Sequence, residues 1–458
     1  MAPKKQKTAR YVAMTALNRF SRRPGYACPV PAEVFEHTAE KQRTTDIVFG
    51  TIRNTTAIDF VITRIAGCPV ERIPPKLLNI IRIAAYELIY TPDVPEYAIV
   101  NEAVENSKII ARKKQADFVN ALLRKLTTAI ENRKIPLDDA DFRKTLPQTT
   151  STGCRFHNCF LPQPDTEQAD YLALAFSLPK WLVAGWLNDF GAQKTRQICF
   201  ASNRRPAIYI RPNKLKTTTH KLTEEFSGSG LDVEVIDPAS MIRIKSAGSV
   251  TELPGFAQGL FTVQDITASY PVHALKPQPG QTILDLCAAP GVKTAQLAEI
   301  TGDRATIIAT DIDSKRLQLV RENVARLGIK SVCIVTYENL RQKTAELGLF
   351  DGILLDVPCS NTGVLAKRPQ VRHRITPEAI NECARVQARL LEKAAPLVKS
   401  KGRICYSTCS IQKKENNHLI DQFLHSKPHF TLEFEELTLP SAQGFDWDGG
   451  YFAALVRR

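Results

Sequence analysis

The last 200 residues alternate between short apolar segments and longer segments with helical periodicity. Four of the apolar segments are 282–287, 306–313, 350–356 and 403–409. Each has the length and composition of a β-strand that is buried on both faces. Strands that alternate regularly with helices predict a doubly wound, mainly parallel sheet. Two late strands, over 430–437 and 451–458, close the chain.

Two of these predicted strands end on cysteine-containing loops. Segment 350–364 reads FDGILLDVPCSNTGV, so Asp356 ends the strand and Cys359 follows in the loop. Segment 402–410 reads GRICYSTCS and ends its strand at Cys409. Ligands of open α/β sheets bind at the carboxyl ends of the strands. Two thiols and a carboxylate at neighbouring strand ends therefore indicate covalent chemistry.

The first predicted strand leads into the loop DLCAAPGVKT, residues 285–294. A loop that holds a dinucleotide pyrophosphate needs G-x-G-x-x-G, and this loop contains only Gly291, which argues against NAD. Asp311 ends the second strand, where a carboxylate can accept hydrogen bonds from ribose hydroxyls. The pattern fits S-adenosylmethionine. A plain strand-to-helix turn is the alternative.

The chain is long and basic. Its 458 residues exceed one ordinary domain, so two to four are expected. It contains 61 Lys and Arg against 47 Asp and Glu, a formal net charge of +14. Such a surplus attracts polyanions, and nucleic acid is the first candidate. The alternative is a basic surface without a special partner.

The cysteine pattern favours a reducing compartment. The eleven cysteines are an odd number, the N-terminus lacks an apolar signal segment, and no apolar run approaches the ~18 residues of a membrane span. We expect reduced thiols, a cytoplasmic location and no membrane partner. Cys154, His157 and Cys159 lie close in sequence but lack a second ligand pair, so no metal site is expected.

Composition divides the chain into four predicted parts. Residues 1–135 read as a helical bundle, and 136–165 as a polar linker rich in Thr, Gln and Pro. Residues 166–258 read as a small α/β RNA-binding module, and 259–458 as the catalytic domain. In the module, Arg204, Arg205, Arg211, Lys214 and Lys216 surround Tyr209 on a predicted strand. This suits a surface that tracks an RNA backbone, although an ordinary soluble strand fits equally well.

The N-terminal part resembles the NusB-like RNA-binding domain. The resemblance is carried by VFGTIRN (48–54), RIAAYELIY (82–90), VPEYAIVNEAVE (94–105) and DFVNALLRKL (117–126). It implies an all-α bundle that contacts RNA through its basic N-terminus and its helix ends. Arg10, Arg53 and Arg124 are candidates for this contact, and for each of them a solvated surface position is the alternative.

The C-terminal part resembles the RNA (cytosine-5) methyltransferases of the bacterial 16S ribosomal RNA methyltransferase B (Sun/Fmu) type. The motifs are VQDITAS (263–269), LDLCAAPGVKT (284–294), TDID (310–313), DVPCSNTGVLAKRP (356–369), YSTCSIQKKEN (406–416) and DGGYFAALV (448–456). The resemblance implies a class I, Rossmann-like methyltransferase domain with a mostly parallel seven-stranded sheet. It also implies S-adenosylmethionine as cofactor and RNA, with 16S rRNA as the first candidate, as partner. The sequence leaves the oligomeric state open, and we favour a monomer.

The resemblance assigns roles to particular residues. Cys409 is implied to be the nucleophile that attacks cytosine C6, Cys359 to assist product release, and Asp356 to bond the cytosine edge. The cofactor-binding residues implied by position are Cys287, Ala288, Ala289, Pro290, Gly291, Val292, Lys293, Asp311, Glu338 and Asp356. Val292 replaces a second glycine of the family loop, and Glu338 is the substitute for an aspartate that the family has after its third strand.

Two other functions fit parts of this pattern. One is DNA cytosine-5 methylation, in which the Pro-Cys thiol attacks, although the Thr-Cys motif at Cys409 and the NusB-like N-terminus favour RNA. The other is a non-catalytic RNA-binding or ribosome-assembly factor. The presence of Asp285, Asp311, Asp356, Cys359 and Cys409 favours catalysis over this second alternative.

Overall fold

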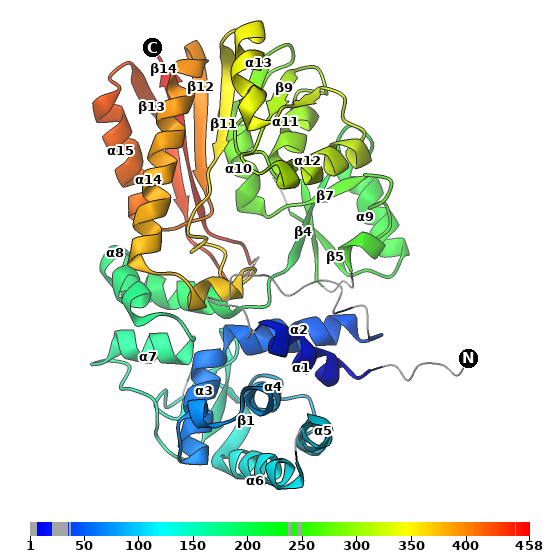
Figure 1. The fold of residues 1–458 in the computed structure, drawn as a ribbon, viewed down its shortest axis with the longest axis vertical. Coiled ribbons are helices and arrows are strands. Elements are labelled where there is room, and N and C mark those ends of the chain that lie inside the picture. Colours follow the sequence, from blue (N-terminus) through cyan, green and yellow to red (C-terminus); the bar gives the residue numbers. More distant parts are fainter. Residues whose placement is uncertain are drawn as a thin grey trace. The chain divides into compact units, whose positions relative to one another are not determined.

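The chain is described here from a computed structural model (Figure 1). The described residues are 7–20, 35, 38–110, 112–138, 140–236, 240–245, 249–444 and 446–458. They form two compact units. The first comprises Met1–Arg205, Leu365–Arg374 and Ser441–Phe445, and the second comprises Pro206–Val364, Ile375–Pro440 and Asp446–Arg458.

The first unit is mainly helical, as the sequence predicts. Its helices are α1 (Ala9–Phe20), α2 (Lys41–Arg53), α3 (Thr55–Ala66), α4 (Pro75–Tyr90), α5 (Glu96–Ile110), α6 (Lys113–Ala129), α7 (Gln168–Ala175) and α8 (Lys180–Asn203). Helix α4 begins at Pro75, where the missing N–H costs nothing. Leu77, Ile81 and Leu88 of α4 are buried, which confirms the helical spacing of its apolar residues.

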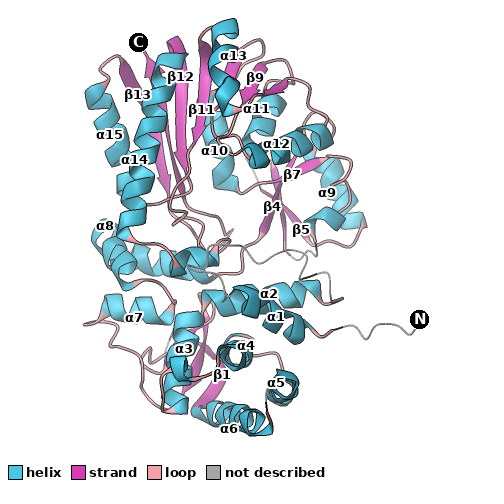
Figure 2. Ribbon diagram, viewed as in Figure 1, coloured by secondary structure: helices cyan, strands magenta, loops and turns pink. Residues whose placement is uncertain are grey.

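A small antiparallel sheet follows the bundle (Figure 2). Its strands β1 (Ile130–Pro136), β2 (Thr145–Pro147) and β3 (Thr152–Phe156) pair in the order β1-β3-β2. The sequence predicts a linker over 136–165, whereas the structure places β2 and β3 there. These strands have only three and five residues, so they are too short to contain the apolar run that marks a strand in sequence.

The second unit contains the predicted seven-stranded sheet. Its strands are β8 (Thr282–Asp285), β9 (Thr306–Ala309), β10 (Val332–Ile334), β11 (Phe350–Asp356), β12 (Val398–Thr408), β13 (Phe430–Thr438) and β14 (Gly450–Arg457). They lie in the order β10-β9-β8-β11-β12-β14-β13. The first five pair in parallel, and β14 is antiparallel to both of its neighbours. This confirms a mostly parallel, Rossmann-like sheet.

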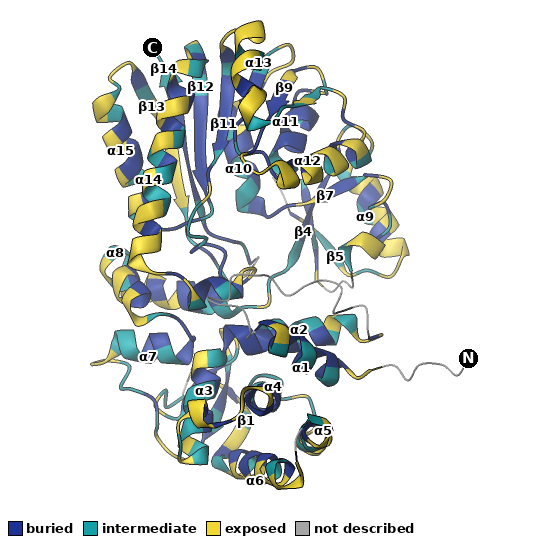
Figure 3. Cartoon of the chain, in the orientation of Figure 1, coloured by how far each residue is buried: buried dark blue, intermediate teal, exposed yellow. Residues whose placement is uncertain are grey.

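Helices cover both faces of this sheet. One apolar core includes residues of α13 (Leu340–Leu347), α14 (Pro377–Ala394) and α15 (Asn417–Ser426). The other includes residues of α10 (Ile266–Leu275), α11 (Val292–Ile300) and α12 (Ser314–Leu327). In β11, Ile353 and Leu355 belong to the first core and Leu354 to the second, and all three are fully buried (Figure 3). Burial on alternate faces explains why the strand is uninterruptedly apolar.

A four-stranded antiparallel sheet also belongs to the second unit. Its strands β4 (Ile208–Pro212), β5 (Val233–Ile236), β6 (Met241–Ile244) and β7 (Phe261–Val263) lie in the order β5-β6-β4-β7, with α9 (Thr219–Gly228) packed against them. Strand β7 lies beyond the boundary predicted at residue 258. Helices α7 and α8, which the sequence assigns to the same module, fall in the first unit instead.

Within the described part of the chain, none of the helices has the length and hydropathy needed to span a bilayer. The same residues contain no group of three or more His, Cys, Asp or Glu side chains arranged as metal ligands. Cys154 is buried in β3, and Cys159 is exposed.

Candidate active site

The parallel pairing of β11 with β12 brings the two cysteine loops together. Asp356 at the end of β11 pairs with Ser407 near the end of β12. Three residues after Asp356 and two after Ser407, the Sγ atoms of Cys359 and Cys409 lie 3.2 Å apart. The sequence predicts that both thiols meet at the carboxyl edge of the sheet, and the structure places them there.

Asp356 and Lys293 form an ion pair beside these thiols. The Nζ atom of Lys293 lies 2.6 Å from Oδ2 of Asp356, and Ser407 Oγ donates to Oδ1 at 2.7 Å. Burial by itself lowers the pKa of Lys293, but the Asp356 charge outweighs it and the pKa is raised. Lys293 therefore stays protonated and also interacts electrostatically with Cys409.

A small pocket of about 50 Å³ opens onto this group. Its lining includes Lys293, Asp356, Cys409, Tyr270 and Asp448. These residues come from α11, β11, the loop after β12, α10 and the segment before β14. A cation, a carboxylate and a thiol therefore face one cavity.

Asn361 holds both cysteine loops. Its backbone is left-handed, with φ of 61°. Its Nδ2 donates to the carbonyl oxygen of Cys359 at 2.7 Å, and its Oδ1 lies 3.3 Å from the Cys409 thiol as acceptor. The contact with Cys409, and then burial, raises the pKa of the Cys359 thiol. In the free protein Cys359 is therefore a thiol.

Glu415 is a fully buried carboxylate that ties the two loops together. It accepts hydrogen bonds from Ser360 N at 2.8 Å, Gln387 Nε2 at 3.0 Å and Ser410 Oγ at 2.5 Å, and also from the Ser360 hydroxyl. Sequence reasoning assigned no role to Glu415 or Asn361. Both lie inside the quoted motifs, but only the fold shows which atoms they contact.

Gly363 allows the loops to approach closely. Its N–H donates to the carbonyl oxygen of Cys409 at 3.0 Å, and its own carbonyl accepts from Gly449 N at 2.8 Å. A Cβ atom at residue 363 would lie 2.4 Å from the Gly449 carbonyl oxygen. A side chain here would push apart the two cysteine loops and the segment before β14.

The predicted cofactor loop lies between β8 and α11. Ala288 and Ala289 are buried, Cys287 is half-buried, and Pro290 is exposed. Gly291 has φ of 98°, and a Cβ there would lie 3.2 Å from Val320 Cα, so glycine is required. Val292 begins α11, where a β-branched residue can adopt the backbone conformation, so its departure from the family loop causes no strain.

The two predicted carboxylates of this site differ in their surroundings. Asp311, which is buried after β9, accepts from Ala289 N at 3.2 Å and from Asp313 N at 3.1 Å. These two hydrogen bonds help to fix the conformation of the loop. Glu338 lies in the short 3₁₀ helix Tyr337–Asn339 after the edge strand β10, and it is exposed.

The surroundings of Asp285, at the end of β8, indicate which kind of cofactor would fit beside it. Thr294 Oγ1 donates to its Oδ2 at 2.6 Å, but its buried Oδ1 has no hydrogen-bond partner among the described residues. Burial raises the pKa of Asp285 to about 7. An orphaned carboxylate oxygen at the end of the first strand fits a ligand that brings a hydrogen-bond donor or a positive charge. The amino-acid part of S-adenosylmethionine has both.

Several residues predicted to contact RNA have internal roles instead. Arg10 is buried and donates to Glu87 at 2.5 and 3.0 Å, and Arg53 is buried and donates to the Ala366 carbonyl at 3.1 Å. In β4, Arg211 forms a buried ion pair with Glu299 of α11, and Tyr209 is buried. These positions carry charge in the sequence, but they stabilise the fold.

Two other RNA candidates, Arg124 and Lys216, lie at exposed positions. Arg124 is exposed on α6 and remains a candidate. Lys216 donates to the carbonyl oxygens of Gln258 at 2.8 Å and Arg326 at 3.1 Å. The basic residues 1–6 lie outside the described residues.

Three family descriptions match the chain. Residues 7–128 match the NusB family, residues 178–251 match the ferredoxin-like domain of RsmF/B-like methyltransferases, and residues 272–450 match the 16S rRNA methyltransferase RsmB/F. The order of the three agrees with the helical, antiparallel and mostly parallel parts of the fold.

Whole-chain comparisons agree with these matches. The probable ribosomal RNA small subunit methyltransferase B of Bacillus subtilis is 28% identical over 97% of this chain and 95% of its own. The solved structure of PH0851 is 25% identical, has a TM-score of 0.76, and covers 99% of this chain and 100% of its own. The probable ribosomal RNA small subunit methyltransferase B of Synechocystis sp. is 31% identical over 95% of this chain and 93% of its own. This chain therefore belongs to the RsmB/F family of small-subunit ribosomal RNA methyltransferases.

Proposed function

We propose that this protein transfers a methyl group from S-adenosylmethionine to C5 of a cytosine in 16S rRNA, through a covalent bond between Cys409 and cytosine C6. The observation that carries the proposal is the 3.2 Å approach of the Cys359 and Cys409 sulfur atoms beside the Asp356–Lys293 ion pair. A single buried thiol would be an inert core residue. Two thiols with a carboxylate and a cation at one pocket suit nucleophilic catalysis.

The chemistry requires a nucleophile because C5 of cytosine is too electron-poor to take a methyl group directly. The Cys409 thiolate adds to C6, and the electron pair of the C5–C6 double bond moves to C5. C5 would then bond to the methyl carbon as the bond between that carbon and the sulfonium sulfur breaks, and the sulfur would keep the electron pair and leave as the thioether S-adenosylhomocysteine. Loss of the C5 proton restores the double bond while the C6–S bond breaks and returns the electron pair to Cys409.

The residues around the two thiols have roles in different steps of this reaction. Lys293 interacts electrostatically with Cys409 and is the positive charge at the pocket that both residues line. Asp356 can bond the N3/N4 edge of the cytosine, which stabilises the ring as the thiolate adds. Cys359, whose pKa is raised, is a strong base once ionised and lies where it can assist loss of the C5 proton and release of the product.

S-adenosylmethionine supplies an electrophilic methyl group on a sulfonium centre when it is bound. The residues that would hold it are the loop Cys287, Ala288, Ala289, Pro290, Gly291, Val292 and Lys293, together with Asp311, Asp356 and Glu338. We add Asp285 because its buried Oδ1 lacks a partner among the described residues. The target base must leave its stack to enter a pocket of this kind.

The test is the identity of the product. The wild-type protein, incubated with unmodified 16S rRNA and labelled S-adenosylmethionine, is expected to yield 5-methylcytidine in a nucleoside digest. Cys409→Ala should yield none. Cys405→Ala is the matched control, because Cys405 is a buried thiol on the same strand, and it should retain activity. Product formation by Cys409→Ala, or methylation of duplex DNA in preference to RNA, would refute the proposal.

A further inference from the structure

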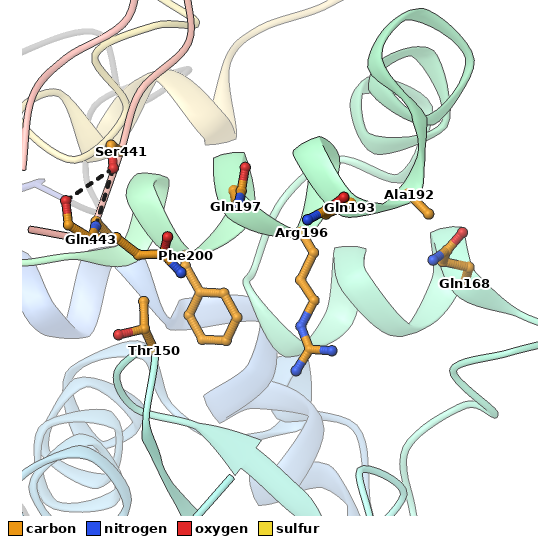
Figure 4. A pocket seen from close by; sticks show the side chains of 10 residues that line it. Thr150, Gln168, Ala192, Gln193, Arg196, Gln197, Phe200, Ser441 and Gln443 are labelled. Atoms are coloured by element: carbon orange, nitrogen blue, oxygen red, sulfur yellow. Dashed lines mark hydrogen bonds between the residues drawn. The ribbon is translucent and has the colours of Figure 1, made fainter. Parts of the chain in front are cut away.

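One pocket of the first unit is lined by none of the residues of the cysteine loops and has no role in the proposed chemistry. It has a volume of about 550 Å³ and is lined by the second half of α8, by Thr150 and Gln168, and by residues 441–443 (Figure 4). Helix α8 is kinked at Gly191, which has φ of 78°. After the kink, Gln193, Arg196, Gln197 and Phe200 recur at helical spacing on one face and line the pocket.

Arg196 is held in place by two aromatic rings. Its guanidinium group lies 4.8 Å from the ring centre of Phe142 and 5.8 Å from that of Phe200. Figure 4 shows its side chain and that of Phe200 extending from α8 into the same region. Among the described residues, the structure gives Arg196 no hydrogen bond and no ion pair, and the residue is exposed. A stacked guanidinium with free N–H groups is preorganised to bind a phosphate in a bidentate manner.

A second pocket of about 400 Å³ continues the first. The two pockets share Thr150, Phe200 and Ala442, and the second adds Arg204 and Arg205. Among the described residues that line the two pockets, Asp46 is the one acidic residue, and it is paired with Arg205 at 3.1 Å, so Arg53, Arg196 and Arg204 leave the lining with a positive balance. The two pockets together form what we call the α8 groove. The positive charge of its lining residues favours a polyanion over a neutral or cationic ligand.

The other residues that line the α8 groove are of the kinds that bind nucleobases. Gln193, Gln197 and Gln443 offer amide donors and acceptors, and Phe200 offers a half-buried ring face. Exposed bases of single-stranded RNA stack on aromatic or guanidinium planes and bond to polar side chains at their edges. Paired bases in a duplex cannot enter such a pocket, because their faces are stacked and their edges are occupied.

We propose that the α8 groove binds a single-stranded segment of the RNA substrate, with Arg196 on a phosphate and Phe200 and the glutamines on an unstacked base. This assignment rests on RNA as the substrate. It moves RNA recognition away from Arg10 and Arg211, which form internal contacts. Residues 441–443 of the groove belong to the same chain segment, between β13 and β14, as Asp448 and Gly449 of the catalytic pocket.

Arg196→Ala in the full-length chain tests the proposal, and Arg64→Ala is the matched control. Arg64 is also exposed in the first unit and stacked on a phenylalanine, 5.2 Å from the ring centre of Phe60, but it lines neither pocket. Binding of a fluorescent single-stranded RNA 15-mer is measured by anisotropy over a range of KCl concentrations. For Arg196→Ala we expect about ten-fold weaker binding and a log–log salt slope that is shallower by about 0.7, the value for one phosphate contact.

Further measurements test whether Arg196 contacts the RNA. Arg196→Lys should restore the salt slope but only part of the affinity, because it keeps the charge and loses the planar fork. Methylation of 16S rRNA by Arg196→Ala should show a raised KM with little change in kcat. Equal binding and equal salt slopes for Arg196→Ala and Arg64→Ala would overturn the proposal. An equal loss of affinity for a duplex of the same sequence would overturn its single-strand part.

A crosslinking experiment on the wild-type chain avoids any effect of substitution on folding. RNA that contains 4-thiouridine is irradiated on the protein, and the crosslinked peptides are identified by mass spectrometry. Crosslinks in 193–200 or 441–443 are expected, and crosslinks confined to other segments would overturn the assignment. Neither binding experiment requires turnover. RNA bound in the groove by a protein that does not methylate cytosine would therefore refute the proposed function alone.

Discussion

The sulfur atoms of Cys359 and Cys409 lie 3.2 Å apart, although the residues are 50 positions apart in the chain. The parallel register of β11 and β12 brings them together, and the Gly363–Cys409 hydrogen bond keeps the loops in contact. The contact raises the pKa of Cys359. The two thiols therefore behave as a pair, in which Cys359 retains its proton while Cys409 is the group beside Lys293.

Asn361→Gly should make Cys409 more reactive. The Oδ1 atom of Asn361 accepts a hydrogen bond from the Cys409 thiol, and this hydrogen bond must break before the sulfur can react. Glycine tolerates the φ of 61° at this position. Loss of one hydrogen bond should accelerate alkylation of Cys409 by a factor of about 2 to 10. Iodoacetamide labelling followed by peptide mass spectrometry measures this, with buried Cys405 as internal reference. An unchanged or slower rate at Cys409 contradicts the assigned contact.

Glu415→Gln should destabilise the second unit and impair turnover. The buried carboxylate accepts from four donors, and a glutamine NH₂ group would face some of them. We expect the free energy of unfolding to fall by about 2–4 kcal/mol. Urea denaturation measures this change, and Glu382→Gln, which alters an exposed residue of α14, is the control. Equal stability of the two variants would show that Glu415 does not hold the loops.

Arg372→Met should destabilise the first unit. Arg372 is buried and donates to the carbonyl oxygens of Arg53 at 2.6 Å, Phe176 at 3.1 Å and Ser202 at 2.8 Å. Methionine leaves these acceptors unpaired, at a cost of about 2–4 kcal/mol. Hydrogen exchange of α2 and α8 should then accelerate. Arg374→Met, at an exposed neighbouring position, should leave it unchanged, and equal exchange in both variants would argue against the contact.

The carboxyl of Asp285 should make stability fall as the pH rises. Burial raises its pKa from 3.8 to about 7 in the folded chain, so the folded state binds this proton more tightly than the unfolded state. This proton stabilises the folded state in full below pH ~4. The stabilisation, of up to about 4 kcal/mol, is lost between pH ~4 and ~7. The stability of Asp285→Asn relative to wild type should therefore increase from pH 5 to pH 8. A pH-independent difference would contradict the raised pKa.

The sheet of the second unit was predictable because burial on both faces leaves a strong signal. The run Ile353-Leu354-Leu355 is apolar because each residue packs into a core, and the positions of Asp356 and Cys359 then follow from the strand end. Short or half-exposed elements leave no such signal. Strand β3 is stabilised by backbone pairing with β1 on one side and with β2 on the other, which any side chain permits.

The partners of charged residues were not predictable in the same way. Arg10, Arg53 and Arg211 have the same composition signal as a nucleic-acid surface, and only tertiary packing places Glu87, Ala366 and Glu299 against them. Arg196 is the opposite case, because nothing in the sequence marks it as a candidate for RNA contact. It lies in an unremarkable segment of sequence, and its stacking on Phe142 and Phe200 depends on the kink of α8 and the turn that precedes β2.

The central claim is that Cys409 attacks the base and Cys359 assists its release. The most direct test is denaturing gel electrophoresis of labelled 16S rRNA incubated with S-adenosylmethionine and each variant. Cys359→Ala should carry a covalently attached RNA, and the double variant Cys359→Ala/Cys409→Ala should carry none. An adduct that persists in the double variant, or one formed by Cys409→Ala alone, would contradict the account.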